Sequence, residues 1–317
     1  MEYMTVQGTE LQAATGAELA KKALENDYYS RFLTFLDAAP KTAETYTRAL
    51  RQFARWTQEK GITQPTREDI ITYRDELKAD HKPSTVQSYI NVVRLFFRWT
   101  AQEGLYPDIA DHIKSAKVDR RHKKEGLYPR QVKKVMDGID RTTEQGKRDY
   151  AILALLFSGG LRTIEAVRAN VEDLAAGKEC AVMYVQGKGY EDKGAAVNIP
   201  EETEDAIRDY LKTRRGAKGK EPLFTSLSDR NNGGRMTTRS ISRIVKNALI
   251  SAGYESDRLT AHSTRRTAVN IALESGMTIQ EVQQFARHSN IATTMIYVDE
   301  MDESKNKCSR AIAKAIF

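Results

Sequence analysis

The chain has 317 residues and carries 50 Lys and Arg against 43 Asp and Glu, a formal net charge of +7. This basic balance favours a polyanionic partner, and the length allows two domains with separate cores. The two cysteines lie far apart without CxxC spacing, so neither a disulfide framework nor a cysteine-bound metal is indicated. The N-terminus has no charged-then-apolar leader, and no apolar run approaches the ~20 residues of a membrane span, which predicts a cytoplasmic protein.

Residues 1–25 are polar and rich in small side chains. Their pattern favours one short helix over residues 17–26, which is too little for an independent domain. We expect an N-terminal arm that is partly disordered or docked on the following chain.

Residues 26–113 have the apolar spacing of amphipathic helices. Tyr46, Leu50 and Phe53 follow one another at intervals of four and three, and the same spacing returns 43 residues later. The string ETYTRALRQFARWTQEKGI aligns with QSYINVVRLFFRWTAQEGL at that constant offset. The segment therefore predicts a compact all-helical domain of four or five helices.

Signals for the helix ends support this prediction. Both aligned strings close on a glycine, Gly61 or Gly104, which is typical of a helix C-terminus. Thr66, followed by Asp69, and Ser84 supply the side chains that cap helix N-termini.

The same domain offers two kinds of candidate DNA contact. Trp56 and Trp99 occupy equivalent places in the repeat, where core packing is the favoured interpretation and base stacking the alternative. Four cations either face phosphates or simply lie on a solvated surface: Arg48, Arg51, Lys82 and Arg94.

Residues 114–126 form the expected domain boundary. The string KSAKVDRRHKK carries six basic residues against one Asp and has one large apolar side chain, Val118. A basic linker is either a solvated tether or a segment that follows a phosphate backbone, and we favour the second. Its candidate DNA contacts are Arg120, Arg121, Lys123 and Lys124.

Residues 127–298 predict a second domain that is mainly helical with a small antiparallel sheet. Residues 148–158 are almost wholly apolar and predict a buried helix, which is followed by Gly159 and Gly160 in a tight turn. The runs at 180–186 and 194–199 predict a β-hairpin with Lys188 at its tip. Further helices are expected over residues 201–212 and 238–252.

Residues 261–298 supply groups suited to attack on a phosphodiester. His262 and Arg265 stand at the head of a predicted helix, and His288 and Tyr297 follow after a break at Gly276. A tyrosine hydroxyl ordinarily has a pKa of about 10, so it needs a neighbouring base or cation to act as a nucleophile at pH 7. Guanidinium groups are well suited to hold the extra negative charge of a phosphorane-like state.

With Arg162 and Lys188, this ordered set resembles the catalytic signature of the tyrosine recombinase, or phage integrase, family. Three departures are visible: Thr264 and Arg266 stand where the family usually has Leu and His, and Arg287 stands where it usually has Gly. The matching strings are GLRTIE at 160–165, GKG at 187–189, HSTR at 262–265, ARHSN at 286–290 and TTMIY at 293–297. The resemblance implies a helical SAM-like core-binding domain before an α+β catalytic domain.

The chemistry and the resemblance assign the same catalytic roles. Arg162 and Arg265 hold the phosphate oxygens, Tyr297 is the nucleophile and His262 assists it. Lys188 protonates the departing 5′-oxygen, with Lys193 of the same loop as the alternative. His288 donates a hydrogen bond to the phosphate and Glu165 orients Arg162. No carboxylate cluster suited to a metal appears in the sequence, so neither a metal nor a cofactor is expected.

The expected function is site-specific recombination of double-stranded DNA through a 3′-phosphotyrosyl intermediate and a Holliday junction, for integration or excision of a mobile element. Resolution of chromosome or plasmid multimers, as in Xer-type systems, is an alternative. A type IB topoisomerase would use the same chemistry, and a non-cleaving DNA-binding protein with this fold is an alternative of another class. Accessory DNA-bending proteins and a place on the nucleoid are compatible with all recombinase roles.

Residues 299–317 predict a C-terminal tail. DEMDESKNK is charged and is interpreted as a tether, whereas CSRAIAKAIF places Cys308, Ile312, Ala315 and Ile316 on one helical stripe. Such a short helix must dock, either on its own domain or, as the resemblance implies, on a neighbouring subunit. The second choice predicts a homotetramer on paired DNA sites with exchanged C-terminal segments.

Overall fold

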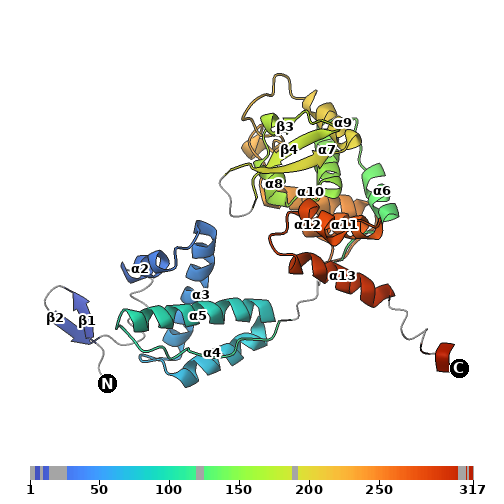
Figure 1. Ribbon diagram of the computed structural model, residues 1–317. Coiled ribbons are helices and arrows are strands. Elements are labelled where there is room, and N and C mark those ends of the chain that lie inside the picture. The colour runs from blue at the N-terminus through green and yellow to red at the C-terminus, as the bar shows by residue number, and fades with distance from the viewer. Residues whose placement is uncertain are drawn as a thin grey trace. The chain divides into compact units, whose positions relative to one another are not determined.

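The computed structural model describes residues 4–7, 10–13, 27–118, 125–187, 192–305, 312 and 314–316, with the backbone alone for 4–7, 10–13, 27–29 and 299–305. The chain divides into two compact units, Met1–Arg120 and Arg121–Phe317 (Figure 1). Among the described residues there is no helix with the length and apolar character needed to cross a membrane. The short helix predicted for 17–26 lies outside the described residues.

The described part of the first unit contains four helices and one hairpin. The helices are α2 (Asp27–Phe35), α3 (Pro40–Glu59), α4 (Arg67–Asp80) and α5 (Pro83–Gln102). The strands β1 (Met4–Gln7) and β2 (Glu10–Ala13) pair antiparallel and were not predicted. The repeat seen in the sequence is a repeat of structure, because α3 and α5 are equally long and stand at the same 43-residue offset.

The ends of these helices follow the local signals. Gly61 and Gly104 adopt left-handed backbone conformations, with φ of 66° and 67°, directly after α3 and α5. Thr66 and Asp69 form the predicted reciprocal cap at the start of α4. Ser84 does not cap α5, which begins at Pro83.

An aromatic core holds the first unit together. Trp99 is 2% exposed and its ring lies 5.5 Å from Phe32 and 5.9 Å from Phe96. Trp56 is 7% exposed, and its indole nitrogen donates a hydrogen bond of 2.7 Å to Glu76. Both tryptophans therefore serve core packing, as favoured from the sequence.

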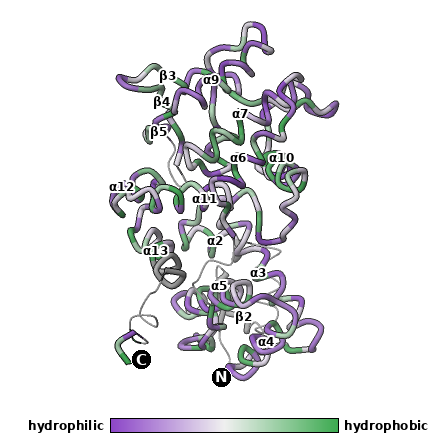
Figure 2. The backbone as a smooth tube through the Cα atoms, turned by 90° about the vertical axis from the view of Figure 1, so that its right-hand side faces the viewer, coloured by the Kyte–Doolittle hydropathy of each residue, from purple (hydrophilic) through white to green (hydrophobic). Residues whose placement is uncertain are grey.

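The second unit is built around the apolar helix α7 (Glu144–Ser158). It packs against α6 (Pro129–Asp137), α8 (Thr163–Arg168), α9 (Glu201–Leu211), α10 (Thr238–Ser251) and α11 (Ala261–Glu274). Its residues Ala151, Ile152 and Leu153 have no exposed surface. Figure 2 shows hydrophobic stretches along α7 and hydrophilic ones in the peripheral loops. The predicted buried helix is confirmed.

A three-stranded antiparallel sheet flanks these helices, in the order β3 (Leu174–Ala175), β4 (Ala181–Val185) and β5 (Ala195–Ile199). Met183 of β4 pairs with Val197 of β5, and the residues at alternate positions of β4 are buried. The sheet and the surrounding helices confirm the predicted fold class.

After α11 come α12 (Ile279–Ala286) and α13 (Ala292–Lys305), and α13 carries Tyr297. The expectation of a tether starting at Asp299 is wrong, because α13 continues without a break to Lys305. This stretch has no Gly or Pro and is rich in Glu, Met and Lys, which favour helix. Ile312 and Ile316 are 57% and 67% exposed.

We predict that Trp99→Ala lowers the free energy of unfolding of the first unit by about 3–5 kcal/mol, since it empties a packed aromatic core. Chemical denaturation of the full chain, followed in both units, measures the effect. Trp99 would instead be a base-stacking residue if the variant kept its stability and lost only DNA affinity.

Candidate active site

A two-glycine turn brings the chain from α7 to the first candidate arginine. Gly160 has a φ of 55°, and a Cβ there would lie 2.8 Å from the Phe285 ring, so this position needs glycine. The turn also aims a backbone acceptor at two arginines. The Gly160 carbonyl oxygen accepts hydrogen bonds from Nη1 of Arg265 at 2.6 Å and from Nη2 of Arg287 at 3.1 Å.

Glu165 lies at the centre of the candidate site. Its side chain has no exposed surface. Oε1 accepts a hydrogen bond from Nη1 of Arg162 at 2.8 Å, and Oε2 accepts from the Arg162 backbone N–H at 2.8 Å and from Nη2 of Arg287 at 2.9 Å. Burial by itself raises the pKa of Glu165, but the charge of Arg287 and the hydrogen bonds from both arginines outweigh it and leave the pKa below its usual value. Glu165 is therefore an ionised anchor for cations.

Arg265, one turn into α11, is 3% exposed. Its guanidinium is held by the carbonyl oxygens of Gly160 and Ala286. Burial, together with the charges of Arg162 and Arg287, lowers the pKa of Arg265 to about 9. The group is still cationic at pH 7, and it lies in a region with more positive than negative charge. An anion entering the site would relieve this imbalance.

His288 and Tyr297 meet beside these arginines. The His288 and Tyr297 rings stack with centroids 6.1 Å apart and planes inclined by 16°. Nδ1 of His288 and the Thr294 hydroxyl share a hydrogen bond of 2.9 Å, which ties the imidazole to the first turn of α13. Tyr297 is 4% exposed, and the Arg266 guanidinium lies 5.8 Å from the centre of its ring. The candidate nucleophile is thus held in place on several sides.

Arg287 has an unusual backbone conformation for a residue with a side chain. It follows α12 with φ 52° and ψ 47°, a left-handed conformation that costs a non-glycine residue about 1–2 kcal/mol. Its side chain offsets this cost through the bonds to Glu165 and Gly160 and through a 2.7 Å hydrogen bond from Nη1 to the Phe285 carbonyl. The sequence marked Arg287 as a departure but gave no sign of these contacts.

A cavity of about 600 Å³ opens onto this cluster. Two arginines and the imidazole form one wall, and the ends of the β4–β5 hairpin form another. Its lining residues are Arg162, Gly187, Asp192, Gly194, Ala195, Arg287, His288 and Ser289. The cationic wall makes it a suitable receptor for a phosphate group.

Two further residues, Lys188 and His262, were expected to take part in catalysis. Lys188 lies outside the described residues. His262 is exposed in the first turn of α11, three residues before Arg265, so both lie on neighbouring parts of one helix face. Lys193, the alternative proton donor, is engaged in an ion pair with Asp173, which disfavours a catalytic role.

The candidate DNA contacts of the first unit fall into two groups. Arg48 and Arg51 line one groove of about 460 Å³ together with Arg55 and Tyr89, and Arg55 was not singled out from the sequence. Lys82 is exposed at the start of α5, and Arg94 is half-buried on the same helix. The four linker candidates at 120, 121, 123 and 124 lie outside the described residues.

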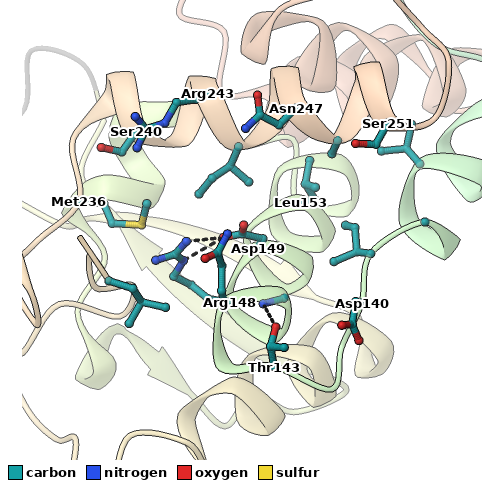
Figure 3. Close-up of a pocket in the computed structure, with 18 of the residues that line it drawn as sticks. Asp140, Thr143, Arg148, Asp149, Leu153, Met236, Ser240, Arg243, Asn247 and Ser251 are labelled. Atoms are coloured by element: carbon teal, nitrogen blue, oxygen red, sulfur yellow. Dashed lines mark hydrogen bonds and ion pairs between the residues drawn. The ribbon is translucent and has the colours of Figure 1, made fainter. Parts of the chain in front are cut away.

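A second cavity, of about 700 Å³, lies in the second unit between α7 and α10 (Figure 3). Arg148 and Asp149 pair at 2.7 Å in its wall, and Arg148 also donates to the Thr225 carbonyl. Burial raises the pKa of Asp149, and the neighbouring Arg148 opposes the rise. None of its lining residues belongs to the six candidate catalytic residues, so its greater volume does not make it the reaction site.

Comparison with protein families gives two matches. The model described as the phage integrase family matches residues 125–304, and the model described as the phage integrase N-terminal SAM-like domain matches residues 27–105. The two matches correspond to the two units and confirm the SAM-like and α+β architecture expected from the sequence.

Individual relatives agree with this assignment. A tyrosine recombinase of Synechococcus elongatus is 30% identical over 207 residues, covering 65% of this chain and 64% of the relative. Tyrosine recombinase XerC of Caldanaerobacter subterraneus is 34% identical over 176 residues, covering 55% and 46%. The chain thus spans between 46% and 64% of these two relatives.

The fold also has a solved counterpart. A crystal structure of XerH site-specific recombinase bound to palindromic difH substrate, a post-cleavage complex, has a TM-score of 0.74 at 16% identity and covers 88% of this chain and 81% of the other. At this identity the likeness concerns the fold alone.

We predict that Glu165→Gln lowers the free energy of unfolding at pH 7 by about 3–5 kcal/mol, because it leaves buried arginine charges without their anion. The pKa of Glu165 is lower in the folded chain than in the unfolded one, so its contribution is complete above about pH 4.5 and is lost as the pH falls through the folded value. The unfolding free energy of the Gln variant should therefore fall less steeply below about pH 4.5.

Glu204→Gln is the control, since Glu204 pairs with the mostly exposed Arg208 and should cost no more than about 1 kcal/mol. Denaturant unfolding of the three proteins between about pH 3 and pH 7 measures these differences. Parallel pH profiles for wild type and Glu165→Gln would contradict the assignment of Glu165 as an ionised anchor.

Proposed function

The chain belongs to the phage integrase family of tyrosine recombinases, and we propose that it cleaves and rejoins DNA at specific sites through a covalent 3′-phosphotyrosyl intermediate. The observation that carries this proposal is the meeting of Arg162, Arg265, His288 and Tyr297, which come from three separate parts of the chain. They gather around Gly160 and the buried Glu165, next to a cavity with a cationic wall.

In the proposed reaction the scissile phosphate enters the cavity lined by Arg162 and His288. Its non-bridging oxygens become more negative as the fifth ligand approaches phosphorus. Guanidinium and imidazole N–H groups stabilise that charge, and because they are already held in place, little reorganisation is needed. The excess positive charge around Arg265 supports the same assignment, since the phosphate would supply the missing anion.

Tyr297 supplies the nucleophile in this scheme. Its hydroxyl oxygen bonds to phosphorus, its proton passes to His262, and the bond from phosphorus to the 5′-oxygen breaks. Lys188 gives a proton to that leaving oxygen. The reverse sequence, with a 5′-hydroxyl from another strand as attacking group, reseals the DNA and restores Tyr297. The phosphotyrosyl bond conserves the energy of the phosphodiester, and the cationic side chains support a reaction that needs no metal ion.

The first unit is proposed to contact the duplex through basic side chains. Arg48, Arg51 and Arg55 line one groove, so their positive charges are gathered where a phosphate backbone could lie. Lys82, Arg94 and the basic linker are further proposed contacts. Such contacts make the affinity fall as salt rises.

The biological role is proposed to be integration or excision of a mobile element. Multimer resolution is the second candidate, because a relative at 34% identity is a tyrosine recombinase XerC. The DNA sites that recombine distinguish the two roles. Integration joins an element's ends to a target, whereas multimer resolution joins two copies of one chromosomal or plasmid site. Formation of a recombinant product would contradict two other roles, a DNA-binding protein that does not cleave and an enzyme that only relaxes supercoils.

We propose four subunits on two paired DNA sites, linked by exchange of their C-terminal segments, with accessory DNA-bending proteins where the sites require them. The exposed Ile312 and Ile316 support a docking place outside this chain. Because α13 runs unbroken from Tyr297 to Lys305, a shift of the tail on a neighbour would move the nucleophile. A nucleoid location follows from the DNA substrate.

We expect Tyr297→Phe to abolish the covalent adduct while DNA affinity stays within a few-fold of wild type, since only one hydroxyl is lost. A nicked suicide substrate and a denaturing gel detect the adduct. Tyr184→Phe, which removes a hydroxyl from a 44% exposed tyrosine of β4, is the control and should form adduct at the wild-type rate. An adduct formed by the Tyr297→Phe variant would assign the nucleophile to another residue.

Removal of residues 308–317 should leave a folded monomer that binds a single half-site, because the cores of both units are built from residues before this segment. Cooperative assembly on paired sites and strand exchange should be lost. Gel mobility on one and two half-sites, together with a recombination assay, measures both effects. Full-length recombination rates in the shortened chain would contradict subunit exchange through this segment.

A further inference from the structure

We propose that Arg287 is a positioning residue that holds the phosphate-binding arginines through Glu165 and the Gly160 carbonyl. This inference rests on the proposed function, because it concerns the same cleavage step. It concerns a position where the sequence departs from the usual Gly of the family, so the contact belongs to this chain's own arrangement.

Arg287 touches the cluster at both of its shared acceptors. Nη2 donates to Oε2 of Glu165 at 2.9 Å and to the Gly160 oxygen at 3.1 Å. Glu165 in turn binds Arg162, and the Gly160 oxygen accepts from Arg265. One nitrogen atom of Arg287 thus bridges the supports of both phosphate-binding arginines.

The backbone of the same residue adds a third link. Its carbonyl oxygen accepts a 3.2 Å hydrogen bond from Nη2 of Arg162. Nη1 of Arg287 is fixed to the Phe285 carbonyl at 2.7 Å, so the side chain is anchored to the end of α12. The Arg162 guanidinium is therefore oriented by Glu165 on one side and by residue 287 on the other.

The left-handed backbone at Arg287 makes these links possible. With φ 52° and ψ 47°, the chain turns sharply after α12, which brings His288 to the cavity and lets the Arg287 side chain lie against Glu165. In both of its ion pairs with arginine, the Glu165 side chain has no exposed surface. A neutral side chain at position 287 would leave the Glu165 carboxylate held by Arg162 alone, through Nη1 at Oε1 and the backbone N–H at Oε2, and would remove its link to the end of α12.

The test measures single-turnover cleavage of a suicide DNA duplex at saturating protein, together with DNA affinity and thermal unfolding. Arg287→Gly removes the side chain and suits the left-handed backbone. Cleavage should slow by about 10- to 100-fold, the usual effect of losing a group that orients a catalytic residue. Arg287 lines the cavity, but its two Nη atoms already donate to Phe285, Gly160 and Glu165, so DNA affinity should change by less than about 3-fold.

Arg287→Lys separates charge from geometry and should recover part of the lost rate, since an ammonium can still bind Glu165. In a Glu165→Gln background, Arg287→Gly should add less than about 3-fold, because the Arg287 side chain reaches Arg162 through the Glu165 carboxylate and its backbone carbonyl is unchanged by the substitution. His112→Gly is the control: His112 also has φ 52° but its side chain is 89% exposed, so its rate should equal that of wild type. Should Arg287→Gly not fold, Arg287→Asn takes its place, since Asn tolerates the same backbone region.

A wild-type cleavage rate in Arg287→Gly would overturn the positioning role and leave the proposed function intact. Independent, multiplying losses in the Glu165→Gln background would overturn it too, and so would a loss confined to DNA affinity. Absence of any adduct with wild type would remove the proposed function itself, and this inference with it.

Discussion

The candidate active site depends on one buried carboxylate. A charge without exposed surface is stable only when its hydrogen-bonding capacity is used, and Glu165 meets this condition by binding Arg162 and Arg287. These partners come from the start of α8 and the end of α12. The ion pairs therefore join two segments far apart in the chain, and they fix the position from which a phosphate would be held.

The rest of the site is arranged around this anchor. Gly160 can approach Phe285 closely because it has no side chain, and its carbonyl oxygen then receives two guanidinium groups. His288 follows Arg287 directly and binds Thr294, so the anchor also sets the start of α13. Through α13 it reaches Tyr297, whose ring is buried in a small core with residues of α11 and α12. Tyr297, the proposed nucleophile, and the arginine cations thus share one rigid support.

The sequence predicts the fold well where local physics decides it. Gly61, Gly104 and the Thr66 cap set helix ends within a few residues, and the apolar run around Leu153 could only be a buried helix. The ordered set of arginines, histidine and tyrosine also identified the groups that meet. These inferences succeed because they need only short-range preferences or the order of a few residues along the chain.

Contacts across long distances in the chain could not be predicted in this way. Arg287 looked like a mere substitution, because its bonds to Glu165 and Gly160 depend on how α12 packs against the turn after α7. The length of α13 was underestimated since a run of mixed charges favours a solvated helix as readily as a loop. Arg55 was overlooked because its place in one groove with Tyr89 of α5 depends on how α3 and α5 pack.

The most direct measurement of the central claim is to identify the residue that becomes attached to DNA. A suicide duplex carrying the chain's own recombination site would be reacted with the full-length protein, and the trapped complex digested and analysed by mass spectrometry. The account predicts a nucleotide bound to the peptide that contains Tyr297, linked through a 3′-phosphate. Attachment at any other residue, or through a 5′-phosphate, would contradict it.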